Sequence, residues 1–154
     1  MGLQLPLDIE ESIGYWLTLT TQAYHRAICD ELAPHGITYR QSQVLSWLAI
    51  EGELSQAELA GKMMIEPPTL VGILDRMERA NLITRHSCPS DRRKKLIRAN
   101  AAAEPIWEKI VECALRIRGK ATADLSERQL ATLKKLLRRV LRNLDQKARA
   151  KSLV

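Results

Sequence analysis

The chain has 154 residues, of which 24 are Lys or Arg and 18 are Asp or Glu, so its net charge is +6. One domain of ordinary size fits this length, and 45% hydrophobic residues exclude extensive disorder. No apolar run approaches the roughly 20 residues that span a bilayer, no signal-peptide pattern opens the sequence, and three cysteines predict no disulfide framework. We therefore expect a soluble, cytoplasmic protein.

The positive charge lies in two short segments of an otherwise acidic chain. Residues 85–98 carry six basic side chains and one acidic, and residues 128–154 carry nine and one. Residues 1–84, in contrast, carry five basic and eleven acidic side chains. A concentrated basic excess is typical of a surface that binds phosphate or nucleic acid.

Apolar residues at three- and four-residue steps predict a mostly helical chain. A long first helix is expected from near Asp8 to just before Pro34. Capping boxes, in which a Ser or Thr and a Glu or Gln three residues later bond each other's backbone, predict three further helix starts. These boxes are Thr38 with Gln41, Ser55 with Glu58, and Ser126 with Gln129.

The middle of the chain predicts two helices joined by a short turn. The helix that begins at Ser55 should end at a turn of residues 62–65. Pro67 and Pro68 suit the first turn of the next helix, because N–H groups there have no helical partner, and this helix should run to about Asn81.

A basic hairpin is expected directly after these two helices. Residues 82–86 and 95–98 have the composition of strands, and residues 87–91 that of a turn. Asn100 is expected to cap a fifth helix. A second helix that can enter the major groove, followed by a basic hairpin that can reach the minor groove, favours a winged helix-turn-helix.

The first and last helices carry longer apolar stripes than one small core requires. A second copy of the same chain would cover them economically. The alternative is that they pack on the central section of their own chain.

Six stretches of the sequence carry a resemblance to a known family. They are Ser55–Ala60, Ile65–Val71, Leu74–Glu78, Leu82–Arg85, Cys88–Arg93 and Ala103–Pro105. Residues 55–104, which contain them, closely resemble the MarR family of winged-helix transcription regulators, and within it the SlyA-like group. The most specific of these signals is Asp91-Arg92-Arg93 after such a recognition helix.

The resemblance implies a mainly α-helical fold with a small β-hairpin wing, as one MarR-type domain over about residues 8–145. The winged helix-turn-helix would be residues 37–99, with the helix-turn-helix at 55–78 and the wing at 82–99. Residues 1–36 and 100–154 would then form a helical dimerisation region.

The resemblance also implies a function. The protein would be a homodimeric, sequence-specific transcription regulator, such as a repressor, on palindromic double-stranded DNA in the bacterial nucleoid. A small aromatic or phenolic effector would release it. No enzyme activity, cofactor, metal or membrane is expected, since no nucleophile, metal-ligand or phosphate-loop pattern is visible.

Residues of both helices and the wing are expected to contact DNA. Pro68, Thr69 and Arg76 would present the polar surface of the recognition helix, and Arg92 and Arg93 would anchor the wing. The complete predicted set is Ser55, Gln56, Pro68, Thr69, Arg76, Arg85, Ser90, Asp91, Arg92, Arg93, Lys94 and Lys95. Trp16 and Trp107 are candidates for lining a pocket for an aromatic ligand.

Three positions depart from the SlyA-like pattern. Gly72 replaces a DNA-contacting arginine on the recognition helix, which predicts a different operator preference. Met64 replaces the glycine usual in the turn before that helix, and Ala99-Asn100 replaces Leu-Thr after the wing.

Other readings stay open. Cys88 beside the wing arginines could make the protein a thiol-based redox sensor, and the basic segments could serve a non-specific architectural DNA-binding protein. His25 and Cys29 share a helix face but lack a second pair of metal ligands. The basic run of the last helix is either a solvated face or a flanking DNA contact, and comprises Lys134, Lys135, Arg138, Arg139 and Arg142.

Overall fold

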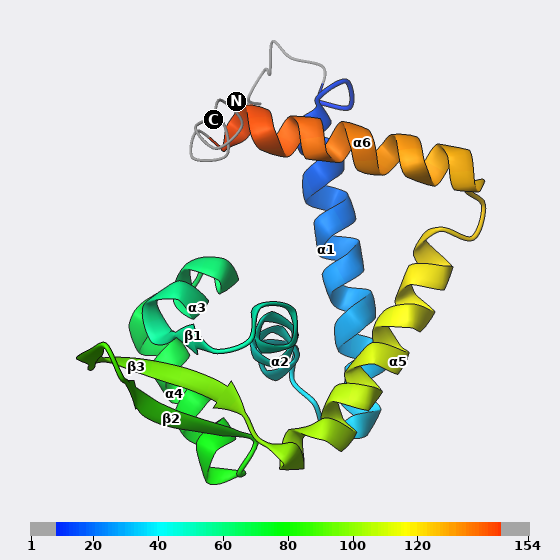
Figure 1. The fold of residues 1–154 in the computed structure, drawn as a ribbon. Helices are drawn as coiled ribbons and strands as arrows, with labels where there is room; N and C mark the ends of the chain where they lie inside the picture. Colours follow the sequence, from blue (N-terminus) through cyan, green and yellow to red (C-terminus); the bar gives the residue numbers. More distant parts are fainter. Residues whose placement is uncertain (1–8, 146–154) are drawn as a thin grey trace, which may run out of the picture. The chain divides into compact units, whose positions relative to one another are not determined.

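The structure is a computed structural model that describes residues 9–145, apart from the side chain of Arg92. The chain divides into two compact units, one ending at Ile117 and one beginning at Arg118, and each is described by itself. The described part is mainly helical with one small antiparallel sheet, as the sequence predicts (Figure 1). Its α-helices are α1 (Ile13–Leu32), α2 (Tyr39–Glu51), α3 (Gln56–Met63), α4 (Pro67–Arg79), α5 (Glu104–Ala121) and α6 (Glu127–Leu144). The strands are β1 (Leu54–Ser55), β2 (Ile83–Cys88) and β3 (Asp91–Ala99), and the 3₁₀ turns are η1 (Ala33–His35) and η2 (Ala101–Ala103).

All three predicted capping boxes are confirmed. In each, the side chain at the N-cap accepts a hydrogen bond from the backbone N–H three residues later, and the reciprocal bond is also made. These bonds satisfy N–H groups that the first helical turn leaves without partners, so they fix where a helix begins. The helices concerned are α2, α3 and α6.

The first helix begins later than its apolar pattern predicts. Asp8 lies outside the described residues, and within them α1 begins only at Ile13. The backbone N–H of Ser12 bonds the carbonyl of Ile9 at 3.0 Å, and the indole of Trp16 donates to the carbonyl of Glu10 at 2.7 Å. These two bonds hold residues 9–12 in a turn rather than a helix.

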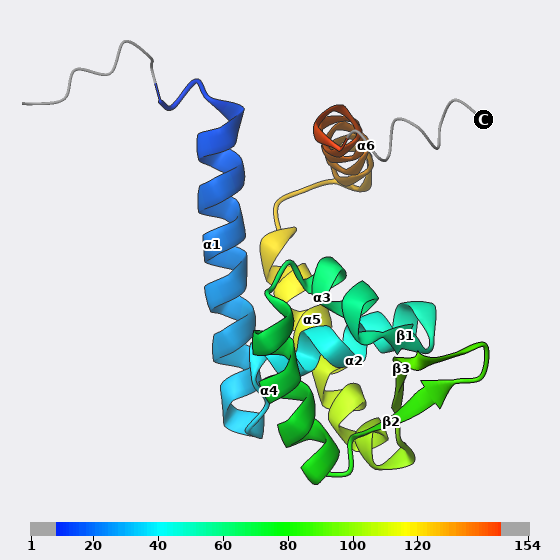
Figure 2. The ribbon, with the colours of Figure 1, turned by 90° about the vertical axis from the view of Figure 1, so that its left-hand side faces the viewer.

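The sheet is larger than the sequence predicts. The strands lie in the order β1–β3–β2, and the short strand β1 was not foreseen. Cys88 pairs with Asp91, so only Pro89 and Ser90 form the tip of the hairpin, rather than the whole of residues 87–91. Both views show this hairpin projecting beyond the helices of its unit (Figures 1 and 2).

Asn100 does not cap a helix with its side chain, in contrast to the prediction. It stands before η2 in an extended conformation without a capping bond. Its amide instead donates to the carbonyl of Asn81 at 3.1 Å, and its Oδ1 accepts from the hydroxyl of Thr84 at 2.7 Å. Asn100 therefore joins the end of β3 to the start of β2.

One hydrophobic core holds the first unit together. It takes buried side chains from the C-terminal end of α1, from α2 to α5 and from the sheet. The N-terminal half of α1 extends away from this core (Figure 2) and exposes large apolar side chains. The second unit contains the end of α5 and the whole of α6, and α6 has no buried residue among those described.

The turn between α3 and α4 forms although Met64 stands where the SlyA-like pattern has glycine. Met64 has φ 50° and ψ 47°, the left-handed conformation that glycine adopts without steric cost. Its side chain is 90% exposed, so it gains little from packing. We therefore infer that Met64 costs the fold about 1 kcal/mol in backbone strain.

Met64→Gly is expected to raise the free energy of unfolding by about 1 kcal/mol relative to Met64→Ala, because only glycine relieves the left-handed strain. Urea unfolding followed by circular dichroism measures the difference. Met64→Ala is the control, since it removes the side chain and keeps the strained backbone. An alanine variant as stable as the glycine variant would contradict the assignment of strain.

Candidate nucleic-acid interface

Helix α4, which the sequence predicts as the recognition helix, buries one face and exposes another. Leu70, Ile73, Leu74 and Met77 are buried in the core. Pro68, Thr69 and Arg76 are exposed on the remaining surface, which agrees with their predicted placement. The helix therefore presents a polar surface in front of a rigid apolar base.

Gly72 leaves space that a neighbouring guanidinium reaches. A Cβ atom placed on Gly72 would lie 3.9 Å from Nη1 of Arg76, one turn further along α4. Gly72 thus removes a side chain from the recognition surface while Arg76 folds back toward the same position. A guanidinium is the group that reads guanine in the major groove, through its O6 and N7 atoms.

A basic hollow lies where α3, α4 and the wing come together. It has a volume of about 410 Å³ and takes its cations from β3. The N-terminus of α3 contributes backbone N–H groups, which favour an anion. The lining residues of this basic hollow are Ser55, Gln56, Ala57, Pro67, Arg93, Lys94 and Lys95.

Glu58 is an acidic residue near the basic hollow. Its carboxylate binds Ser55 rather than the basic side chains of the hollow. Its carboxylate accepts hydrogen bonds from the hydroxyl and the backbone N–H of Ser55, at 2.5 and 2.8 Å. These bonds, with smaller contributions from Lys94 and Lys62, lower the pKa of Glu58 below its ordinary value. The carboxylate therefore serves the capping box and stays ionised near neutral pH.

Hydrogen bonds order the wing from its tip to its base. Asp91 accepts from the backbone N–H of Arg93 at 3.0 Å, and Lys95 donates to the hydroxyl of Ser87 at 2.9 Å. The side chains of Arg93 and Lys94 are exposed. The predicted role of Arg92 cannot be placed, because its side chain lies outside the described part.

Cys88 sits at the tip of the wing in surroundings that favour its thiolate. The hydroxyl of Ser90 lies 3.2 Å from its Sγ. This hydroxyl and the backbone N–H groups of Ser90 and Asp91 lower the pKa of the Cys88 thiol. A lowered pKa increases the fraction of reactive thiolate at neutral pH.

Arg85 joins α4 to strand β2 of the hairpin. Its guanidinium donates from Nη2 to Asp75 at 2.7 Å and from Nε to Glu78 at 3.0 Å. The bonds from Arg85 lower the pKa of Glu78, and the pKa of Arg85 is raised in turn. Its side chain is only 23% exposed. Among the predicted contact residues, Arg85 is therefore the one already engaged by α4.

The two acidic partners of Arg85 were not predicted from the sequence. Asp75 and Glu78 lie three residues apart on α4, so they share one face of the helix. Two acidic residues at this spacing, followed by an arginine near the start of the next strand, could have predicted an ion pair between α4 and β2. This ion pair shows which side of α4 faces β2.

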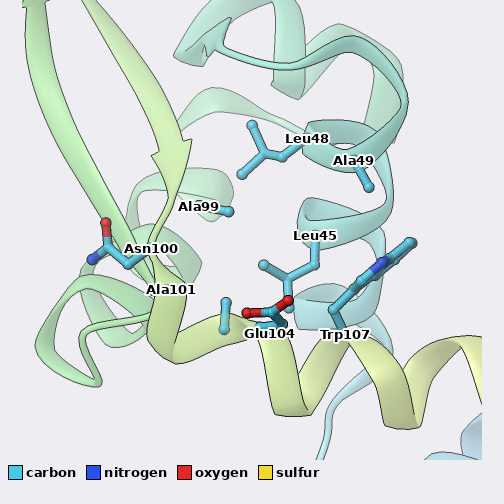
Figure 3. Close-up of a pocket in the computed structure, with 9 residues that line it drawn as sticks. Leu45, Leu48, Ala49, Ala99, Asn100, Ala101, Glu104 and Trp107 are labelled. Atoms are coloured by element: carbon cyan, nitrogen blue, oxygen red, sulfur yellow. The ribbon is translucent and has the colours of Figure 1, made fainter.

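The two tryptophans proposed for a ligand pocket lie in different places. Trp107 lines a hollow of about 300 Å³ between α2, the end of β3 and the start of α5, which we call the α2–α5 hollow (Figure 3). Trp16 is not among the residues that line it and is 53% exposed on α1. The α2–α5 hollow is lined by Leu45, Leu48, Ala49, Ala99, Asn100, Ala101, Ala103, Glu104 and Trp107.

Neither a metal site nor a membrane-spanning helix is found among residues 9–145. His25 and Cys29 lie 3.6 Å apart, but no three His, Cys, Asp or Glu side chains of this range are grouped to hold a metal ion. In the same range, no helix has the length and hydropathy needed to cross a membrane.

A match to known proteins agrees with this geometry. Residues 37–95 match the model of the MarR family. The matched segment is thus similar to that family over 59 of the 154 residues. It contains the whole of the helix-turn-helix and most of the wing strand β3, and thus the basic hollow.

Solved MarR-type structures share the fold over most of the chain. A variant of MarR from Escherichia coli complexed with operator DNA has a TM-score of 0.77 and 23% identity, covering 90% of this chain and 99% of that one. BpsR from Bordetella bronchiseptica, whose DNA binding is regulated by 6-hydroxynicotinic acid, gives 0.76 and 23%, covering 88% and 97%. CouR from Rhodococcus jostii, bound to p-coumaroyl-CoA, gives 0.76 and 25%, covering 88% and 93%.

Arg85→Ala is expected to lower the free energy of unfolding by about 1–2 kcal/mol at pH 7, because it removes charged hydrogen bonds at a partly exposed site. Urea unfolding at several pH values measures the loss. The lowered pKa of Glu78 means that the ion pair stabilises the fold above pH 4.5, the ordinary value, and less as the pH falls below it. The difference between wild type and variant should therefore shrink in acid.

Arg98→Ala is the matched control for Arg85→Ala. Arg98 is a neighbouring arginine of the wing that is 61% exposed and lies 3.8 Å from Glu53. Its loss should cost less than about 0.5 kcal/mol. Equal losses for the two variants would contradict a special role of Arg85 in joining α4 to β2.

Proposed function

We propose that this protein is a sequence-specific DNA-binding transcription regulator of the MarR type. The observation that carries the proposal is the basic hollow, which gathers the N-terminus of α3, the start of α4 and the wing cations on one surface. Backbone N–H groups and lysines there suit phosphates, while α4 presents Thr69 and Arg76 to base edges. In this proposal residues 37–99 form the DNA-binding region.

The exposed surface of α4 predicts an operator sequence that differs from those of SlyA-like proteins. The SlyA-like assignment implies an arginine at position 72, where this chain has glycine. Because Arg76 approaches that position, we propose Arg76 as the arginine that reads the major groove. The wing would contact the minor groove through Arg93 and its neighbours.

A homodimer is the second part of the proposal. Large apolar side chains of α1 and α6 are exposed in the single chain, including Trp16 at 53% and Leu141 at 64%. Exposed apolar stripes of this extent mark a protein–protein interface. Residues 1–36 and 100–154 would form the dimerisation region, and two recognition helices would read the half-sites of a palindrome about one helical turn apart.

Release by a small molecule is the third part. BpsR and CouR, two proteins of the same fold, are described with 6-hydroxynicotinic acid and p-coumaroyl-CoA. The α2–α5 hollow supports a small-molecule ligand here, because it is concave, mostly apolar and of adequate size. Regulation through the Cys88 thiol is the alternative that its lowered pKa favours.

Arg93→Ala is expected to weaken binding about tenfold to a hundredfold without unfolding the protein, because it removes a minor-groove or phosphate contact. A DNA fragment selected from genomic DNA by the purified protein serves as the probe in fluorescence anisotropy at several salt concentrations. The slope of log affinity against log salt should become shallower by about 0.9 if one phosphate contact is lost.

Lys109→Ala is the control for Arg93→Ala, since Lys109 lies on α5 and is paired with Glu112 at 3.0 Å. Its affinity should equal that of the wild type. A shuffled fragment of the same length distinguishes specific from architectural binding. Equal affinity for selected and shuffled DNA, or an unchanged affinity of the Arg93 variant, would refute the proposed mechanism.

Leu137→Asp should dissociate the dimer, because a carboxylate would lie in the apolar stripe of α6, where Leu137 is 42% exposed in the single chain. Sedimentation equilibrium is expected to give twice the chain mass for the wild type and a lower average for the variant. Ala131→Asp is the control with the same charge change, since its spacing from Lys135 and Arg138 places it on the basic face. A monomeric wild type would overturn the dimer.

A further inference from the structure

The α2–α5 hollow contains a single ionisable side chain. Seven of its nine lining residues are apolar. The eighth is Asn100, whose side-chain amide is hydrogen-bonded to Asn81 and Thr84. Figure 3 shows the Asn100 amide turned away from the hollow. The ninth residue is Glu104, an exposed residue whose carboxylate is drawn among the lining side chains in Figure 3. Neither arginine, lysine nor histidine lines this hollow.

The carboxylate of Glu104 is available to a ligand. Within residues 9–145 it has no hydrogen bond or ion pair with another side chain. An exposed, unpaired carboxylate next to an apolar surface repels an anion and attracts a cation. The hollow therefore disfavours a small aromatic acid.

Trp107 adds a second group that suits a cation. Its indole is partly buried against the core and lines the hollow one turn along α5 from Glu104. The face of an indole attracts ammonium groups, and apolar walls made by Leu45, Leu48 and Ala49 suit a hydrocarbon body. The pair of Trp107 and Glu104 thus selects both the shape and the charge of the ligand.

We propose that the α2–α5 hollow binds an apolar, aromatic-sized molecule that carries an amine or another cationic group, with Glu104 as the counter-ion. This inference rests on the proposed function, in which a small molecule controls DNA binding. The coupling would pass through Ala99, the last residue of the wing strand β3, which also lines the hollow. A bound molecule therefore contacts the base of the wing.

Three probes of similar size test the charge preference. They are 2-phenylethylammonium, 2-phenylethanol and 3-phenylpropionate, titrated into the full-length protein by calorimetry at pH 7. The ammonium probe should bind about tenfold more tightly than the carboxylate probe, because only it complements Glu104 and Trp107. Equal or tighter binding of the carboxylate, or no binding of the ammonium, would overturn the proposal.

Glu104→Gln tests whether this residue supplies the preference. The variant keeps the shape of the side chain and should remove about the same tenfold advantage of the ammonium probe. Glu108→Gln is the matched control, because Glu108 is exposed on the next turn of α5 and does not line the hollow. A Glu104→Gln variant with a changed melting temperature but unchanged probe selectivity would show a purely structural role of Glu104 and overturn the proposal.

A DNA-binding measurement separates this inference from the proposed function. Anisotropy with the selected DNA fragment is recorded without probe and then with each probe in turn. Absence of DNA binding without any probe contradicts the proposed function and leaves the ligand site to the calorimetry. Release of DNA by the ammonium probe in wild type, and not in Glu104→Gln, supports both. Release by the carboxylate probe, independent of Glu104, keeps the function and overturns the ligand class.

Discussion

The bonds of Arg85 to Asp75 and Glu78 fix the geometry on which a DNA-binding role depends. A recognition helix and a wing can contact neighbouring grooves only if their relative position is constant. Arg85 supplies this constraint because it is mostly buried and its forked guanidinium binds two carboxylates of α4 from the first residues of β2. Unpaired, Asp75 and Glu78 would repel the phosphates of DNA bound near α4. Their pairing with Arg85 reduces this repulsion.

The same logic governs the remaining charges around the interface. The carboxylate of Glu58 accepts hydrogen bonds in the Ser55 capping box, and that of Asp91 accepts one from the backbone N–H of Arg93. These two acidic groups are thus committed to local structure, whereas Arg93, Lys94 and Lys95 of β3 stay exposed. A chain that is acidic outside two basic segments can therefore still present a positive surface near those acidic residues. Local hydrogen bonding, rather than net charge, decides which charges a partner meets.

Signals within a few residues of one another were readable from the sequence, and those that depend on the fold were not. Capping boxes act over three residues, so Thr38 with Gln41 and its two counterparts were predicted correctly. Strand β1 has two residues and exists only because β3 lies beside it. Asn100 is of a residue type that often caps helices, but its side chain binds Asn81 and Thr84, which are distant in the sequence. For the site, exposure of Thr69 and Arg76 followed from helical spacing, whereas the partners of Arg85 required the packing of α4 on β2.

A shared fold does not transfer the chemistry of a ligand. The residues that line the basic hollow all lie within residues 37–95, the segment that matches the MarR family model. The α2–α5 hollow draws several of its residues from beyond that segment, including Glu104 and Trp107. A single carboxylate there reverses the charge that the hollow can accept, at no cost to the helix, because an acidic residue in the first turn of α5 also complements the helix dipole. The winged helix and the ligand preference can therefore vary independently, since different residues determine them.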